Sequence, residues 1–168
     1  MFKKILLVAA LLIPMLASAQ TLKIGLVDVN EIVPKMPESA EASKQLEETQ
    51  KKYEEEFKKL QEEMQRRVDE YQNMSQDELP AIRERKTREL ADYQSKLEQF
   101  SGEAQQHLQN MYQELMAPIL QKVQTAIQAV GKEGGYSLIQ DKNPQLIYYF
   151  DAPVVDITND VKAKMGIK

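Results

Sequence analysis

Acidic side chains are the most abundant groups in this sequence that could take part in chemistry, and they occur in adjacent runs. Glu54, Glu55 and Glu56 form one run, and Glu62 with Glu63 forms another. General acid–base catalysis needs two carboxylates that face one substrate, whereas neighbouring residues of a helix point in different directions. These runs therefore predict solvated helix faces rather than a catalytic pair.

The chain has little material for nucleophilic or metal chemistry. It contains no Cys, which excludes disulfides, thiolate catalysis and Cys-based zinc sites. The single histidine, His107, precedes Leu108 of an apolar series, so we expect it to flank a helix contact. Gly134 and Gly135 lack the context of a phosphate-binding loop and predict a turn from helix to strand. We therefore expect no catalytic residue, no cofactor and no metal, and a protein that is not an enzyme.

The first 19 residues have the pattern of a cleaved signal peptide. Two lysines precede an apolar stretch over 5–16, and an Ala-Ser-Ala sequence leads to an expected cut between Ala19 and Gln20. The alternatives are an uncleaved anchor and an ordinary buried helix, but the stretch is short for a membrane helix of about 20 residues. We therefore expect an exported protein.

Residues 38–117 predict two long helices that pack along an apolar seam. Apolar residues recur at steps of three, four or seven among Glu, Gln, Lys and Arg, as in coiled coils. The two series mirror each other about residue 77, so that Tyr53 is level with Phe100 and Tyr71 with Ile82. An antiparallel hairpin requires such a mirror. The seam residues are Leu46, Tyr53, Phe57, Leu60, Met64, Val68, Tyr71 and Met74, followed by Ile82, Leu90, Tyr93, Leu97, Phe100, Ala104, Leu108, Met111 and Leu115.

Turn-forming residues place the tip of this hairpin near 73–80. Asp77 is positioned to cap the second helix, with Pro80 in its first turn. Pro118 lies level with the prolines at 34 and 37, and we predict that these helix-disrupting residues mark the base of the arm. The alternative is one continuous helix that dimerises as a parallel coiled coil.

The rest of the mature chain, 20–37 with 118–168, predicts a small β-rich body that ends in a short helix. Branched and aromatic residues predict strands over 21–30, 136–140 and 145–150, the last two flanking a turn at 141–144. Asp156 or Thr158 is expected to cap the final helix. The fold class is therefore α+β, with a long two-helix arm on a small body.

Three segments in this order and spacing resemble the Skp/OmpH family of periplasmic outer-membrane-protein chaperones. They are KIGLVDVNEI at 23–32, the charged hairpin, and YSLIQDKNPQLIYYFDAPVVDITNDVKAKM at 136–165. The resemblance implies a homotrimer whose β-rich trimerisation body carries one antiparallel coiled-coil arm per subunit. It also implies an ATP-independent holdase that keeps unfolded outer-membrane proteins in the cavity between the arms. The alternative is a structural or adaptor coiled-coil protein of the periplasm that binds a folded partner.

Two sets of candidate residues follow from this reading. The predicted subunit interface consists of the strand residues Ile24, Leu26, Ile139, Ile147 and Tyr149. The candidate client-contacting residues are Met64, Tyr71, Met74, Tyr93 and Phe100, which also lie on the seam and are expected mainly to hold the hairpin together.

Charge limits the partners that the arm can attract. The whole chain has a net charge of −4, and residues 38–117 contain 12 basic and 19 acidic residues. The best-known members of the resembling family have basic arms. The acidic arm argues against nucleic acid, lipopolysaccharide or the membrane surface as a partner, and for client capture through apolar contacts.

Overall fold

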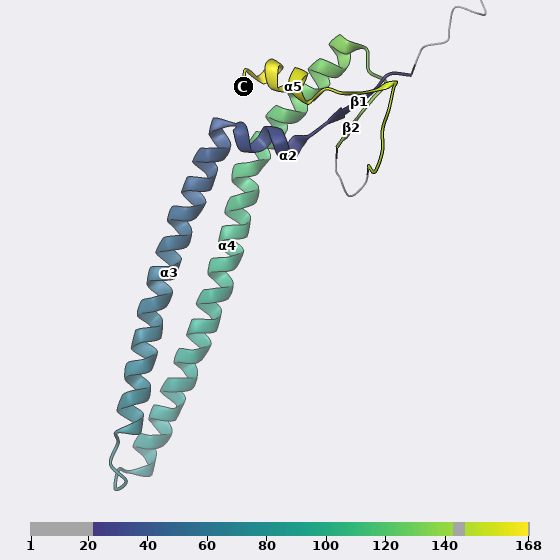
Figure 1. Ribbon diagram of the computed structural model, residues 1–168. Helices are drawn as coiled ribbons and strands as arrows, with labels where there is room; N and C mark the ends of the chain where they lie inside the picture. The colour runs from purple at the N-terminus through teal and green to yellow at the C-terminus, as the bar shows by residue number, and fades with distance from the viewer. Residues whose placement is uncertain (1–21, 143–146, 168) are drawn as a thin grey trace, which may run out of the picture. The chain divides into compact units, whose positions relative to one another are not determined.

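The computed structural model describes residues 22–142 and 147–167 (Figure 1). In chain order the elements are β1 (Ile24–Val27), α2 (Val29–Ile32), the 3-10 turn η2 (Val33–Lys35), α3 (Pro37–Gln72), α4 (Pro80–Gly134), β2 (Leu138–Asp141), β3 (Val154–Asp156) and α5 (Thr158–Met165). The chain divides into two compact units. One, the sheet unit, combines the residues up to Ile32 with those from Val123 onward, and the other, the helical unit, is 33–122. The predicted signal peptide and its cut at Ala19 and Gln20 lie outside the described residues.

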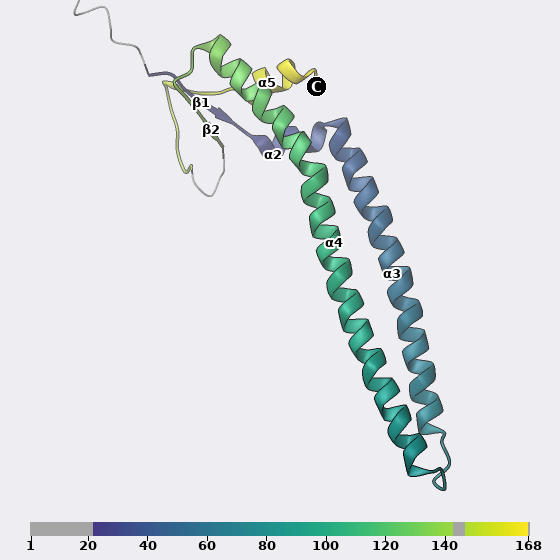
Figure 2. The same cartoon turned by 180° about the vertical axis from the view of Figure 1, so that it is seen from behind.

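Two long helices make up most of the helical unit, and α3 lies beside the first part of α4 in both views (Figures 1 and 2). They are separate helices, so the alternative of one continuous helix is wrong. The Leu79 carbonyl accepts the N–H groups of Ile82 and Arg83, which places Pro80 at the first helical position. Asp77 lies two residues before this start, and its own N–H donates to the Ser75 hydroxyl instead of capping α4 through its carboxylate.

The prediction that Pro118 disrupts the second helix is wrong, because α4 continues through it to Gly134. A proline removes one N–H donor, and the long helical stretches on both sides compensate for that single loss. The helix ends where Gly135 adopts a left-handed φ of 65° and the Tyr136 N–H donates to the Gly131 carbonyl at 3.0 Å. The predicted glycine turn from helix to strand is therefore confirmed.

The sheet is parallel throughout, in the order β2-β1-β3. The strand predicted at 136–140 corresponds to β2, but the strand predicted at 145–150 is wrong for the described residues 147–150, which form none. The third strand is Val154–Asp156, whose Cα partners begin with Val154 opposite Ile24. Its position follows from the next residue, because Ile157 is fully buried and donates its N–H to the Leu26 carbonyl at 2.8 Å.

A small apolar core holds the sheet unit together. Its most buried side chains include Val27, Ile32, Ile157 and Val161, each at most 2% exposed. Lys162, at the edge of this core, reaches the Glu31 carboxylate at 2.5 Å. Within the described ranges, no helix is long and apolar enough to cross a membrane.

Candidate functional site

An aromatic cluster lies between α3 and α4 in the helical unit. The Tyr53 ring packs edge-on against both Phe100 and His107, with centroids 5.8 Å apart in each case. Phe57 stacks on Phe100 at 6.4 Å. His107 therefore flanks the helix contact, as its sequence position predicts, and it serves as a packing surface for Tyr53.

Contacts nearer the tip join later residues of α3 to earlier residues of α4. Lys86 binds Glu70 at 3.2 Å, and the Arg67 guanidinium lies 4.7 Å from the centre of the Tyr93 ring. The Thr87 hydroxyl lies 3.4 Å from that of Tyr71. These pairs occur in reverse order along the two helices.

The predicted pair of Tyr53 with Phe100 is in contact, but contacts on either side of it depart from the predicted register. Tyr71 meets Thr87 instead of Ile82, and His107 meets Tyr53 instead of lying level with Leu46. The displacement amounts to one or two helical turns. An apolar seam that repeats every three or four residues tolerates such a slip with little loss of burial, so side-chain shape and the tip decide between registers.

The candidate client-contacting residues all lie on this helix contact and are half-buried. Tyr71, Tyr93 and Phe100 contact the residues just described. Met64 and Met74 have the same intermediate exposure. Their role in binding a client stays a prediction. What the structure places there is a packed seam inside one chain.

Charged side chains cover the exposed faces of both helices and pair along the helix. Lys51 binds Glu47 at 2.8 Å, and this hydrogen bond lowers the pKa of Glu47 and raises that of Lys51. Pairs this exposed contribute little to stability. The adjacent carboxylates at 54–56 and 62–63 belong to these solvated faces, apart from Glu63, which is half-buried beside Arg67.

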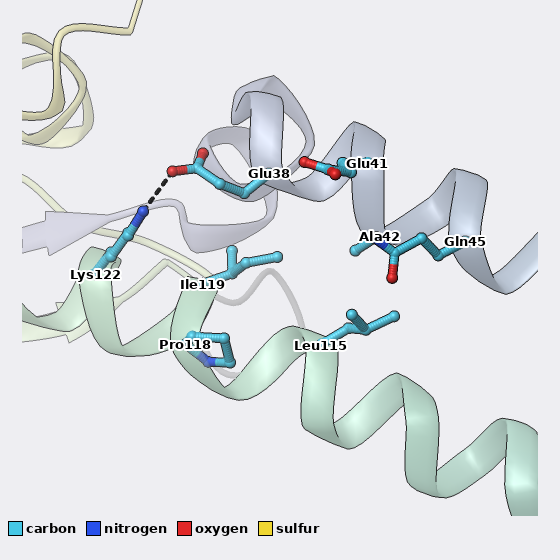
Figure 3. Close-up of a pocket in the computed structure, with 8 residues that line it drawn as sticks. All are labelled: Glu38, Glu41, Ala42, Gln45, Leu115, Pro118, Ile119 and Lys122. Atoms are coloured by element: carbon cyan, nitrogen blue, oxygen red, sulfur yellow. Dashed lines mark hydrogen bonds and ion pairs between the residues drawn. The ribbon is translucent and has the colours of Figure 1, made fainter.

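A pocket of about 320 Å³ lies between α3 and α4 (Figure 3). Its apolar side is formed by Ala42, Leu115 and Ile119, and Glu38 reaches across its rim to Lys122 at 2.5 Å. The hydrogen bond from Lys122 lowers the pKa of Glu38. Pro118 also lines the pocket, whose carboxylates Glu38 and Glu41 have neither a nucleophile nor a histidine beside them. The pocket therefore offers packing space rather than catalytic chemistry.

The five predicted interface residues differ widely in exposure. Leu26 is only 3% exposed and lies inside its own chain, whereas Tyr149 is 80% exposed. Ile24, Ile139 and Ile147 are half-buried. Further large apolar side chains are exposed in the same unit, namely Leu22, Leu138, Tyr148, Phe150 and Val155. The sheet unit thus exposes several large apolar side chains to solvent.

Sequence reasoning missed two exposed apolar side chains of α4, Tyr112 and Leu120, because it followed the seam alone. They are 53% and 47% exposed. The sequence does contain a signal for this surface, because no Lys or Arg occurs between Lys96 and Lys122. Across the described residues, no group of three or more His, Asp or Glu side chains is placed to hold a metal ion.

Comparison with known proteins identifies the family of this chain. The family model described as outer membrane protein (OmpH-like) matches residues 23–165. The chain is also 32% identical over 148 residues to the chaperone protein Skp of Yersinia enterocolitica, a match that covers 86% of this chain and 87% of that protein. The chain therefore belongs to the OmpH-like family, as its sequence resemblance predicts.

Proposed function

We propose that this protein is a periplasmic, ATP-independent holdase that binds unfolded outer-membrane proteins and keeps them from aggregating on the way to assembly. The pair of long helices carries the proposal. Their flanks are exposed along most of their length, and they offer many weak contacts rather than one shaped site. Such a surface suits clients that share composition but no fixed structure.

Independence from ATP is supported by the sequence. It contains no phosphate-binding loop of the form GxxxxGK followed by Ser or Thr. A holdase without an energy source must release its client through competition, so each contact has to be weak. The exposed charges of α3 and α4 pair with one another along each helix, so they offer a client only weak contacts.

We propose a homotrimer assembled through the sheet unit. Leu138 on β2 and Val155 on β3 are 52% and 43% exposed, and β2 and β3 are the outer strands of the sheet. Open edges and exposed aromatic residues favour association with further copies. The number three comes from the family resemblance, which also implies that the arms of the subunits enclose one client cavity.

The acidic arm supports capture by apolar and uncharged contacts. Long-range attraction would favour basic clients, whereas most contact energy at short range comes from buried apolar area. Lipopolysaccharide and the membrane surface are negatively charged and do not match this arm.

The alternative is a structural or adaptor coiled-coil protein of the periplasm that binds a folded partner. The exposed apolar side chains of the sheet unit would serve such a protein equally well. The two functions differ in what the helices must do, because an adaptor has no need to hold an unfolded chain.

A shortened arm tests the proposal. The stacked Phe57 and Phe100 provide a level at which both helices can be cut, so 58–99 is replaced by a short turn that leaves this pair in register. The full-length protein, without its first 19 residues, should prevent aggregation of an unfolded outer-membrane barrel protein diluted from urea, at near-stoichiometric amounts. The shortened protein should assemble but protect the client less well, because it keeps only the part of the arm next to the sheet unit's residues in the chain. Failure of the full-length protein to protect any barrel client would favour the adaptor.

A further inference from the structure

One flank of α4 is free of charge over about 29 Å, at 1.5 Å per residue. The seam residues Ala104, Leu108 and Leu115 define the side of α4 that faces α3. One residue further round the helix lies a row that we call the uncharged strip, composed of Ser101, Gln105, Gln109, Tyr112, Met116 and Leu120. The carboxylates of this stretch, Glu103 and Glu114, fall on the opposite side of the seam.

The uncharged strip is open to solvent. Tyr112 and Leu120 are 53% and 47% exposed, Gln105 and Gln109 are exposed, and Met116 is half-buried. This surface differs from the exposed residues of α3 between Glu47 and Glu70, most of which are charged. It combines apolar side chains with amides that both donate and accept hydrogen bonds.

We infer that the uncharged strip binds one extended, uncharged segment of an unfolded barrel client; this inference rests on the proposed function. At about 3.3 Å per residue, its length matches about nine residues of extended chain. A transmembrane β-strand has about 9–11 residues and alternates apolar with polar side chains. Tyr112, Met116 and Leu120 contact the apolar side chains, and Gln105 and Gln109 bind the unpaired backbone.

Charge and area both favour this occupant. A charged segment would lose hydration against the strip without gaining a partner, which costs free energy. A second copy of the chain would need about 800 Å² per partner for a stable interface. The large exposed apolar side chains of the strip, Tyr112 and Leu120, together supply roughly 200 Å² of apolar area, which is small beside such an interface. That area suits a transient contact with one strand.

Two isosteric pairs of substitutions distinguish an effect of charge on the strip from a general effect of added charge on the arm. Gln105→Glu with Gln109→Glu adds two negative charges to the strip. Gln61→Glu with Gln65→Glu adds the same charges, at the same spacing, to an exposed face of α3, where Gln65 donates a hydrogen bond to Asp69. The Kd for a fluorescent, unfolded outer-membrane barrel protein should rise about tenfold for the strip pair, since buried carboxylates lack partners there. It should change less than about twofold for the α3 pair.

A second measurement does not depend on the charges. The chain has no Cys, so Gln109→Cys and Gln61→Cys can each carry one photo-reactive label. The label at 109 should cross-link to the bound client, and preferentially to its membrane-spanning strands. Equal loss of affinity in the two charged pairs, or equal cross-linking from both labels, would overturn the assignment of the strip. The proposed function would survive that result, because it fails only if the unmodified protein does not bind the client.

Discussion

Asp156 links the end of the sheet to the start of α5. Its carboxylate accepts the N–H of Thr158 at 3.0 Å and the hydroxyl of Thr158 at 2.6 Å, and it binds Lys142 at 2.8 Å. Asp156 therefore caps α5, as predicted. It does so from the position before Ile157, which is the N-cap residue of the helix. Partial burial raises the pKa of Asp156, but the hydrogen bonds from Lys142 and Thr158 outweigh it and lower that pKa from 3.8 to about 2.

This lowered pKa predicts a specific acid sensitivity. As the pH falls from about 4 to about 2, the unfolded chain takes up a proton at Asp156 before the folded chain does, so the free energy of unfolding falls. Asp156→Asn should be less stable at neutral pH and should lose this part of the pH dependence. Chemical denaturation across that pH range measures both effects.

Gly102 lies inside α4, where a glycine weakens a helix. A Cβ built at this position meets nothing within 4 Å, so close packing does not explain the residue. Gly102→Ala should raise the free energy of unfolding by about 0.5–1 kcal/mol, because alanine restricts the unfolded chain and keeps the helical conformation. Thermal melting followed by circular dichroism measures the change. A lower melting temperature would show that the helix must bend at this point.

At the scale of whole elements, α4 contains two prolines in different situations. Pro80 occupies the first helical position, where a missing N–H is harmless, and Pro118 lies in the interior. Pro118→Ala should therefore stabilise the protein by about 1–2 kcal/mol through one restored helical hydrogen bond. Pro80→Ala is the matched control and should change stability by less than about 0.5 kcal/mol. Urea unfolding compares them, and equal effects would contradict the assignment.

For the whole molecule, the exposed aromatic residues of the sheet unit are the best test of assembly. Leu26 is too buried for this purpose, since a charge there would unfold the unit before it reported on subunit contacts. Tyr149→Asp changes an 80% exposed side chain, so the subunit should still fold. A trimer that buries Tyr149 should dissociate, because the new carboxylate would be desolvated without a partner.

Sedimentation equilibrium measures this dissociation, and Tyr112→Asp provides its control. Tyr112 is also an exposed tyrosine, at 53%, but it lies in the helical unit. The Tyr112 variant should keep the mass of the wild-type assembly. If both variants sediment as the wild type does, Tyr149 lies outside the interface.

The sequence alone determined the features that depend on neighbouring residues. The spacing of apolar side chains predicts two long helices, and the residues around Pro80 predict where the second begins. Gly134 and Gly135 predict the end of that helix. These features are local because a helix is closed by hydrogen bonds four residues apart and its ends are capped within one turn.

Features that depend on distant residues are set by packing in three dimensions. The helix register that pairs Tyr71 with Thr87 is one of nearly equivalent slips of a repeating seam. The third strand formed at Val154–Asp156 because the buried Ile157 fixes the segment beside β1, whereas the aromatic residues at 148–150 have strand propensity but no core to cover. The exposure of Tyr112 and Leu120 likewise follows from which face of α4 is turned toward α3. Local propensity cannot specify these choices, since each is decided by competition for one buried surface.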